Sequence, residues 1–85
     1  MRSVKEEIAE KICYTELVYG RINKKLNIEL PNNKIEEMVR SIINETEESA
    51  FQQKGKNIYV ANKTRKIRLT INSNTFRIIT ADKLK

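Results

Sequence analysis

Histidine and tryptophan are absent from this chain of 85 residues, and cysteine and proline each occur only once. Without histidine, neither a Ser–His nor a Cys–His nucleophilic pair can form, and zinc sites with imidazole ligands are excluded. The single cysteine, Cys13, excludes an internal disulfide and suits a reducing cytoplasm. Because it lies in an apolar helical pattern, Cys13 is interpreted as a small buried residue. One aspartate and one cysteine provide no cysteine cluster and no paired-aspartate metal site, and we expect neither a metal nor a cofactor.

Long apolar runs are also missing. No stretch approaches the roughly 18 apolar residues that cross a bilayer, and the charged N-terminal segment is unlike a signal peptide. We therefore expect a cytoplasmic protein without a membrane partner. The length and the 39% hydrophobic content predict one domain over residues 1–85, with a helical half at 1–48 and a β half at 49–85. Because this length is near the lower limit for a self-sufficient core, self-association is a further expectation.

Acidic residues are missing from positions 49–81, which carry seven Lys and Arg residues. Residues 1–48 hold eight basic and ten acidic groups, whereas residues 49–85 hold nine basic groups and one acidic group. The formal net charge of +6 is therefore one local field in the C-terminal half of this basic protein. Such a field attracts polyanions, so RNA or DNA is the leading hypothesis for the partner. Glu45, Glu47 and Glu48 are interpreted as a solvated charge run.

Apolar residues recur every three or four positions in the first half of the chain. A stripe from Val4 to Leu26 predicts an amphipathic helix over most of residues 4–26. Ser3 with Glu6 has the spacing of a capping box at its start. Thr15 could cap a second helix, which leaves open a break around residues 13–15. A second stripe, Ile35 to Ile43, predicts a helix after the connection at residues 27–33.

After Ser49 the apolar period changes from 3.6 to 2. Three short alternating segments, around residues 58–60, 67–71 and 76–79, predict an antiparallel meander, and Phe51 is a candidate start for a fourth strand. The expected fold is α+β: two N-terminal helices packed on one face of a C-terminal three- to four-stranded antiparallel sheet, as a two-layer sandwich.

Matching the apolar faces also predicts how the strands pair, because a slip of one residue would turn every side chain over. We expect Leu69 opposite Ile78 and Val60 opposite Ile67. The outward face of the sheet would then carry two rows of side chains. These rows are Tyr59–Arg68–Ile79 and Asn57–Thr70–Arg77.

The outward face and its adjoining loops form the predicted binding surface. Cations neutralise phosphates, and an aromatic ring on an open sheet can stack an unpaired base. A protein interface is the alternative, because Tyr and Arg are also favoured there. The predicted site residues are Lys54, Lys56, Tyr59, Lys63, Arg65, Lys66, Arg68, Arg77 and Ile79.

Three functions remain open from the sequence. The first is a small non-enzymatic module that binds nucleic acid or another polyanion. The second is a protein-interaction module, such as an inhibitor or regulatory subunit of a nucleic-acid-handling complex. The third is a histidine-free endoribonuclease toxin, in which cations would stabilise the phosphorane charge. The reference pKa values of Tyr, Lys and Glu, about 10, 10.4 and 4.3, lie far from neutrality, so we expect no enzyme.

Two blocks of the sequence carry a family resemblance, ICYTELVYGRINKKL at residues 12–26 and IRLTINSNTFRIITADK at residues 67–83. Together with Gly55-Lys56-Asn57, they resemble a family of small uncharacterised bacterial proteins that is known only as a domain of unknown function. The resemblance implies a freestanding cytoplasmic protein of bacterial or phage origin, and it implies no activity. It assigns no role to the polar residues of the first block, namely Tyr14, Thr15, Glu16 and Arg21.

The C-terminal meander is also similar to the sheet of RelE/ParE-like toxins, in which basic residues project from an antiparallel sheet. This chain departs from that pattern, because the first seven residues predict a helix where those toxins have a strand. The similarity is therefore one of fold, and it implies no catalytic residue.

Overall fold

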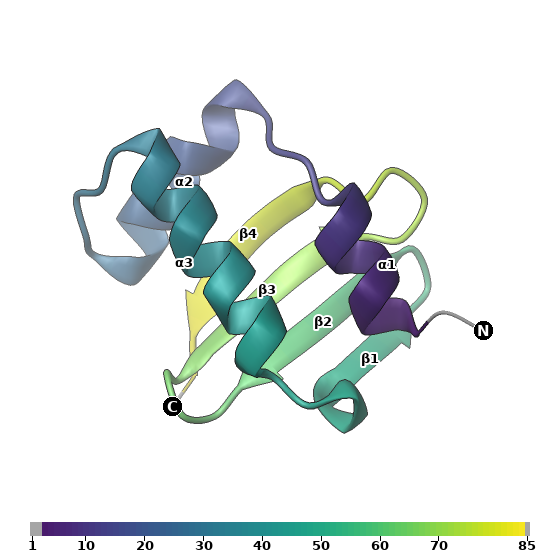
Figure 1. The fold of residues 1–85 in the computed structure, drawn as a ribbon. Coiled ribbons are helices and arrows are strands. Elements are labelled where there is room, and N and C mark those ends of the chain that lie inside the picture. The colour runs from purple at the N-terminus through teal and green to yellow at the C-terminus, as the bar shows by residue number, and fades with distance from the viewer. Residues whose placement is uncertain (1–2, 85) are drawn as a thin grey trace.

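The computed structural model describes residues 3–84, and the charges of Arg2 and Lys85 lie outside them. Three α-helices come first: α1 (Val4–Lys11), α2 (Glu16–Leu26) and α3 (Asn32–Glu45). A short 3-10 turn, η1 (Glu48–Ala50), leads into four strands, β1 (Phe51–Lys54), β2 (Asn57–Asn62), β3 (Ile67–Asn72) and β4 (Ile78–Lys83). The α+β class and the antiparallel sheet are confirmed, and Phe51 does begin a strand (Figure 1).

The prediction of two N-terminal helices is wrong, because the helix expected over residues 4–26 is interrupted. Ser3 caps α1 by accepting a hydrogen bond from the Glu6 backbone N–H, as its spacing with Glu6 indicated. The chain then becomes extended at Cys13, whose N–H donates to the Phe76 carbonyl, while Ile78 N–H donates to the Cys13 carbonyl. These two long-range hydrogen bonds replace the helical ones, and α2 begins after Thr15.

Cys13 itself is exposed rather than buried, which corrects the interpretation of this residue. It occupies the extended linker between α1 and α2, and its thiol lies 3.5 Å from the Thr75 carbonyl oxygen. The linker runs beside the start of β4, where Cys13 pairs with Arg77 as a single parallel bridge. Part of the free edge of β4 is thereby covered.

The four strands pair in sequence order, but the expected register is wrong by two residues between β2 and β3. Val60 lies opposite Leu69, and Ile67 lies opposite Asn62. A shift of two residues leaves every side chain on its predicted face, so apolar matching alone could not detect it. The turn between these strands is longer than face matching assumes, because the Asn62 side chain accepts a hydrogen bond from the Arg65 N–H and Lys66 has a left-handed φ of 58°.

The pairing of β3 with β4 differs for the same reason. Leu69 lies opposite Ala81 instead of Ile78, and Arg68 lies opposite Asp82 instead of Ile79. The Asn72 side chain accepts hydrogen bonds from the N–H groups of residues 74 and 75, and Phe76 has a φ of 58° outside any strand. A register shift follows at Thr70/Ile71: Thr70 pairs with Thr80 and Ile71 pairs with Ile78, so Ile79 has no partner on β3. Ile79 is therefore not a member of the outward row in which it was expected.

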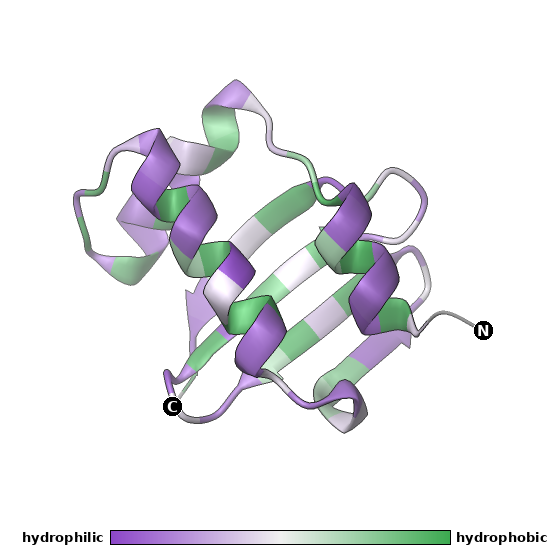
Figure 2. Ribbon diagram, in the orientation of Figure 1, coloured by the Kyte–Doolittle hydropathy of each residue, from purple (hydrophilic) through white to green (hydrophobic). Residues whose placement is uncertain are grey.

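Helices and sheet share one apolar core. Figure 1 shows α1 and α3 over one side of the sheet and α2 beside β4, and Figure 2 shows hydrophobic and polar residues alternating along the strands. The buried side chains of both layers form a single cluster. Its members are Ile8, Val18, Ile22, Leu26, Ile35, Val39, Ile42, Ile43, Ile58, Val60, Leu69, Ile71, Ile78 and Ala81. The opposite side of the sheet, called the outer face below, carries the remaining strand side chains.

The fold is compact for its length. Its radius of gyration is 11.8 Å, close to the ~12 Å expected of a folded chain of this size. The helices have 8, 11 and 14 residues, and within residues 3–84 none is long and apolar enough to cross a membrane.

Candidate functional site

A groove of about 810 Å³ lies over the outer face of the sheet. Its lining residues come from β1, β2 and β3, from the end of α3 and the segment that links it to β1, from the β2–β3 turn, and from the residue after β4. We call this feature the outer groove. It is lined by Glu45, Thr46, Glu47, Ser49, Ala50, Gln52, Lys54, Tyr59, Ala61, Asn62, Lys63, Thr64, Arg68 and Leu84.

Three outward side chains of β2 and β3 form the floor of the outer groove. Tyr59 and Ala61 are two residues apart in β2 and therefore share a face, and Arg68 lies directly opposite Ala61. The Arg68 guanidinium lies over the Tyr59 ring, with its carbon 5.4 Å from the ring centroid, as a cation–π pair. Ala61 contributes only a methyl group beside this pair.

Two lysines line the outer groove. Lys54 ends β1, and Lys63 begins the turn after β2. The six residues of β2 separate the two turns by roughly 20 Å, at about 3.3 Å per residue. The outer groove therefore has a positive charge toward each end of β2.

Carboxylates also reach the outer groove, which the acid-free sequence of residues 49–81 did not indicate. Glu45, the last residue of α3, and Glu47, in the segment before η1, both line it. Glu45 accepts two hydrogen bonds from Arg65, at 2.6 and 3.2 Å, and the bond from Arg65 lowers the pKa of this carboxyl group. Glu47 is exposed at the rim. Three basic and two acidic side chains thus line the outer groove.

Arg68 has an ion partner of its own. Its guanidinium lies 3.9 Å from Asp82 on β4, and Lys25 of α2 lies 3.5 Å from the same carboxylate. The Arg68 side chain remains 45% exposed, so water screens this pair. Arg68 is therefore free to exchange Asp82 for another anion at small cost.

A buried polar network holds one wall of the outer groove in place. The Thr46 hydroxyl donates to the Ile42 carbonyl at 2.6 Å and accepts from the Asn62 amide at 3.0 Å. The Asn62 carbonyl oxygen accepts the Arg65 N–H at 2.9 Å. Asn62 and Thr46 are both buried, so this network links the end of α3 to the turn that carries Lys63.

The structure gathers only some of the predicted site residues. Lys54, Tyr59, Lys63 and Arg68 line the outer groove. The others do not line it: Lys56, Arg65, Lys66, Arg77 and Ile79. Arg65 is engaged with Glu45, and the half-buried Ile79 accepts a hydrogen bond from Arg21 through its carbonyl.

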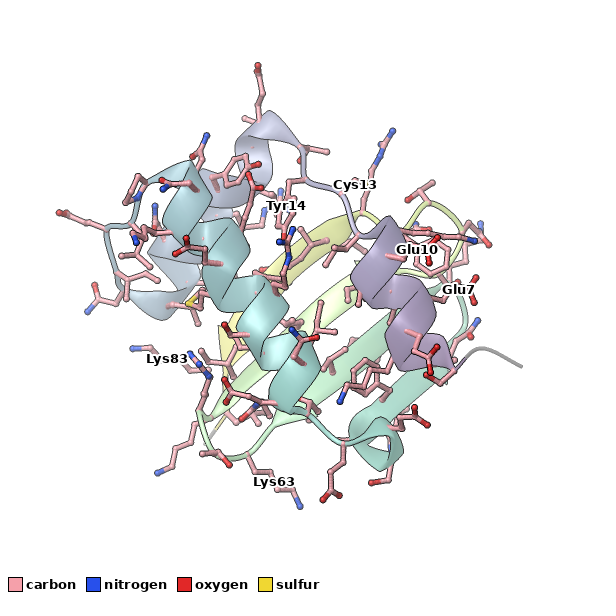
Figure 3. All side chains as sticks on the ribbon, in the orientation of Figure 1. Glu7, Glu10, Cys13, Tyr14, Lys63 and Lys83 are labelled. Carbon is pink, nitrogen blue, oxygen red and sulfur yellow. The ribbon has the colours of Figure 1, made fainter. Side chains whose placement is uncertain are left out.

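The predicted cations are divided between the two ends of the sheet. Arg77 pairs with Cys13 at one end, and Lys63 lies in the β2–β3 turn at the other. Figure 3 shows Cys13 and Lys63 at opposite sides of the molecule. Lys56 lies at the same end of the sheet as Arg77, because its carbonyl oxygen accepts a hydrogen bond from the N–H of Ser73 in the β3–β4 loop. The single basic patch expected from the sequence is therefore two separate groups of cations.

Sequence reasoning missed Ala61, Gln52 and the carboxylates of the outer groove. Ala61 has the same outward parity as Tyr59 and was identifiable from alternation, but alanine carries no chemical signal. Gln52 lies opposite Tyr59. This pairing could be recognised only once residues 51–54 were known to form the strand β1. Glu45 and Glu47 reach the outer groove only because the end of α3 approaches the β2–β3 turn.

A second polar cluster lies on the helical side of the sheet. Tyr14 and Tyr19 are stacked with ring centroids 5.7 Å apart, and the Tyr19 hydroxyl donates to Glu36 at 2.8 Å. Burial, followed by the nearby Glu36 charge, raises the pKa of Tyr14 to about 12. The Tyr14 hydroxyl is buried and has no hydrogen-bond partner within the described part of the chain. Thr15 is the N-cap residue of α2, but its side chain makes no capping hydrogen bond.

One comparison with known proteins identifies a family. The model of the family described as "Protein of unknown function (DUF3781)" matches residues 6–82, which is nearly the whole chain. The chain belongs to this family, and the resemblance of its two sequence blocks is confirmed. No curated protein and no solved structure matches the chain. Family membership therefore brings no activity to test against the outer groove.

Proposed function

We propose that the outer groove binds nucleic acid, without cleaving it. Lys54 and Lys63 neutralise phosphates, and Tyr59 with Arg68 supplies a stacking surface. The observation that supports this most directly is a groove on the uncovered face of the sheet, with a ring and a guanidinium on its floor and a lysine toward each end of β2. The helices cover the other face, so the strand side chains here remain accessible.

The net charge of the whole protein also supports a phosphate-bearing partner. The formal charge of +6 attracts a polyanion from a distance, and the outer groove then supplies the local contacts. Exposed ion pairs such as Arg68–Asp82 contribute between about 0 and 1 kcal/mol, so a phosphate can replace Asp82 at little cost. The lone cysteine and the family resemblance support a cytoplasmic setting.

Binding without cleavage is the reading that fits the placement of the tyrosines. Tyr14 and Tyr19, whose pKa values are raised, lie in the α1–α2 linker and in α2, away from the outer groove. The floor residue Arg68 is 45% exposed, and solvent weakens the charge coupling that would tune an acid or a base. We propose that labelled RNA stays intact with the purified protein, with or without magnesium.

A protein partner is the second candidate, and the carboxylates favour it. Glu45 and Glu47 give the outer groove both signs of charge, which suits an interface with complementary charges better than a uniform phosphate chain. Tyr59 and Arg68 are residue types enriched at protein interfaces. The contribution of Glu47 therefore separates the two candidates.

The test measures binding of fluorescently labelled single-stranded RNA and DNA of mixed sequence by anisotropy over a salt series. We expect log affinity to fall linearly with log salt, and Arg68→Ala to flatten the slope by about one for its lost phosphate contact. Lys34→Ala is the matched control, because Lys34 is also a cation in an exposed ion pair but lies on α3. It should leave the slope within error.

Glu47→Gln supplies the second arm of the test. Removing this carboxylate should strengthen nucleic-acid binding roughly twofold to fivefold, since a unit charge close to a phosphate in water is worth about 1 kcal/mol. Glu37→Gln on α3 is the control. Absence of binding to either RNA or DNA at low salt, or weaker binding by Glu47→Gln, would refute the proposal.

A further inference from the structure

We propose that the outer groove accepts unpaired bases, with one base seated over Ala61 beside the Tyr59–Arg68 pair, so that single strands bind in preference to duplexes. This inference rests on the proposed nucleic-acid function. It adds a substrate class and names Ala61 as the residue that determines it.

The first argument is the shape of the surface. Reading a duplex requires an element that enters a groove of the nucleic acid, such as a helix or a two-stranded ribbon in the major groove. The outer groove is instead concave, and its floor consists of side chains of β2 and β3. A concave site receives a group that projects from its ligand. In nucleic acids, that group is a base turned out of an unpaired strand.

The second argument is the identity of the floor residues. Ala61 is half-buried and lies directly opposite Arg68, while Tyr59 is its neighbour on the same face of β2. Any longer side chain at position 61 would occupy the space beside the ring and the guanidinium. The Arg68 guanidinium already lies over the Tyr59 ring, so the small residue leaves room for a flat group beside this pair and not between its members.

The third argument is the position of the charges relative to that floor. Lys54 and Lys63 line the outer groove at the two ends of β2, whereas Ala61 lies between them along the strand. A strand that passes along β2 places phosphates near the lysines while a base between them faces Ala61. Phosphate contacts hold the strand, and stacking distinguishes paired from unpaired bases.

The experiment compares a labelled single strand of mixed sequence with the same strand annealed to its complement, at one low salt concentration. We expect the single strand to bind the wild-type protein more tightly. Ala61→Leu, which fills the floor without changing charge, should weaken single-strand binding by about 5- to 150-fold, the equivalent of one base stack. Ala9→Leu, at an exposed alanine of α1, is the matched control and should bind as wild type.

A second pair of variants protects the test against a folding defect in Ala61→Leu. Tyr59→Ala should lose the same single-strand affinity, whereas Tyr59→Phe should retain it because the ring remains. Equal binding of strand and duplex, or full single-strand affinity in both Ala61→Leu and Tyr59→Ala, would overturn the inference and leave the electrostatic proposal standing. Failure of every nucleic acid to bind would overturn both.

Discussion

On the inner face of the sheet, Val60, Leu69 and Ala81 lie opposite one another and are fully buried. On the outer face, the next row is Ala61, Arg68 and Asp82. Adjacent residues of the same strands therefore belong either to the core or to the outer groove. The inner face contributes apolar area and thus stability. The outer face contributes charge, one aromatic ring and space, so exposed side chains there can change with little cost in stability.

The largest effect that tests this comparison is expected from Leu69→Ala. Removing a fully buried leucine leaves a cavity and should lower the free energy of unfolding by about 2–5 kcal/mol. Against a total of roughly 5–15 kcal/mol, such a loss is large for a domain of this size. Urea denaturation followed by circular dichroism measures it.

The matched variant is Arg68→Ala, one residue away on the outer face. It should change the free energy of unfolding by no more than about 0.5 kcal/mol. Comparable losses for the two variants would mean that the faces do not divide stability from binding in this way.

A smaller effect is expected at the end of β2, where a buried polar residue takes the place of an apolar one. Asn62→Ala removes the hydrogen bonds to Thr46 and to the Arg65 N–H. Leaving such groups unpaired should lower the free energy of unfolding by about 1–3 kcal/mol. The same denaturation assay applies.

Asn57→Ala, on the outer face at the other end of β2, is the control for Asn62. Its amide lies 3.4 Å from the Tyr59 hydroxyl and is only partly buried, so we expect a smaller change. A larger loss in the free energy of unfolding for Asn57→Ala than for Asn62→Ala would contradict the role of the Thr46–Asn62 network in holding this wall of the outer groove.

Tyrosines on the two sides of the molecule should respond differently to alkaline pH. Because the folded pKa of Tyr14 is raised from 10.0 to about 12, its neutral form stabilises the fold below pH 10. That contribution is lost between pH 10 and 12, where the unfolded chain ionises first. Tyr14→Phe should therefore unfold at a higher pH than the wild type, as measured by circular dichroism during alkaline titration.

The expected effect of Tyr14→Phe at neutral pH is small, because the hydroxyl it removes is buried without a partner in the described residues. Tyr59→Phe, on the outer face, is the comparison. An alkaline shift of the same size in both variants would show that burial of Tyr14 is not its cause.

The smallest effect is expected from Glu45→Gln at the rim of the outer groove. Arg65 lowers the pKa of Glu45 below 4.5, so the pair stabilises the fold above that pH, and its contribution is lost as the pH falls through the lowered value. Both side chains are partly exposed to solvent, and the thermal midpoint at neutral pH should change by no more than the replicate error. A marked loss of stability that persists in high salt would contradict this.

Much of the fold followed from periodicity. The change from a 3.6-residue to a 2-residue period at Ser49 placed the helices before the sheet. Strand alternation put Leu69 in the core and Tyr59 and Arg68 on the other face. These outcomes depend on which side of an element a residue lies, and local alternation is sufficient to decide that.

The errors have a common cause in the loops. Asn62 and Asn72 hydrogen-bond the backbone of the turns that follow them, and residues 66 and 76 adopt left-handed conformations. The turns are consequently longer than face matching assumed, and the strands pair two or three residues away from the expected register. The break after α1 arises similarly, from hydrogen bonds between Cys13 and a segment more than 60 residues later.

The sequence by itself determined the order of the elements, the face of most residues in β2 and β3 and the absence of acidic residues from positions 49–81. These properties depend on neighbours along the chain. Only the tertiary structure decided that Glu45 and Glu47 line the outer groove, that Arg77 lies far from Lys63, and that Ala61 lies opposite Arg68. Strand register and the approach of α3 to the β2–β3 turn bring distant residues together, and both depend on loop hydrogen bonds that a periodic pattern does not encode.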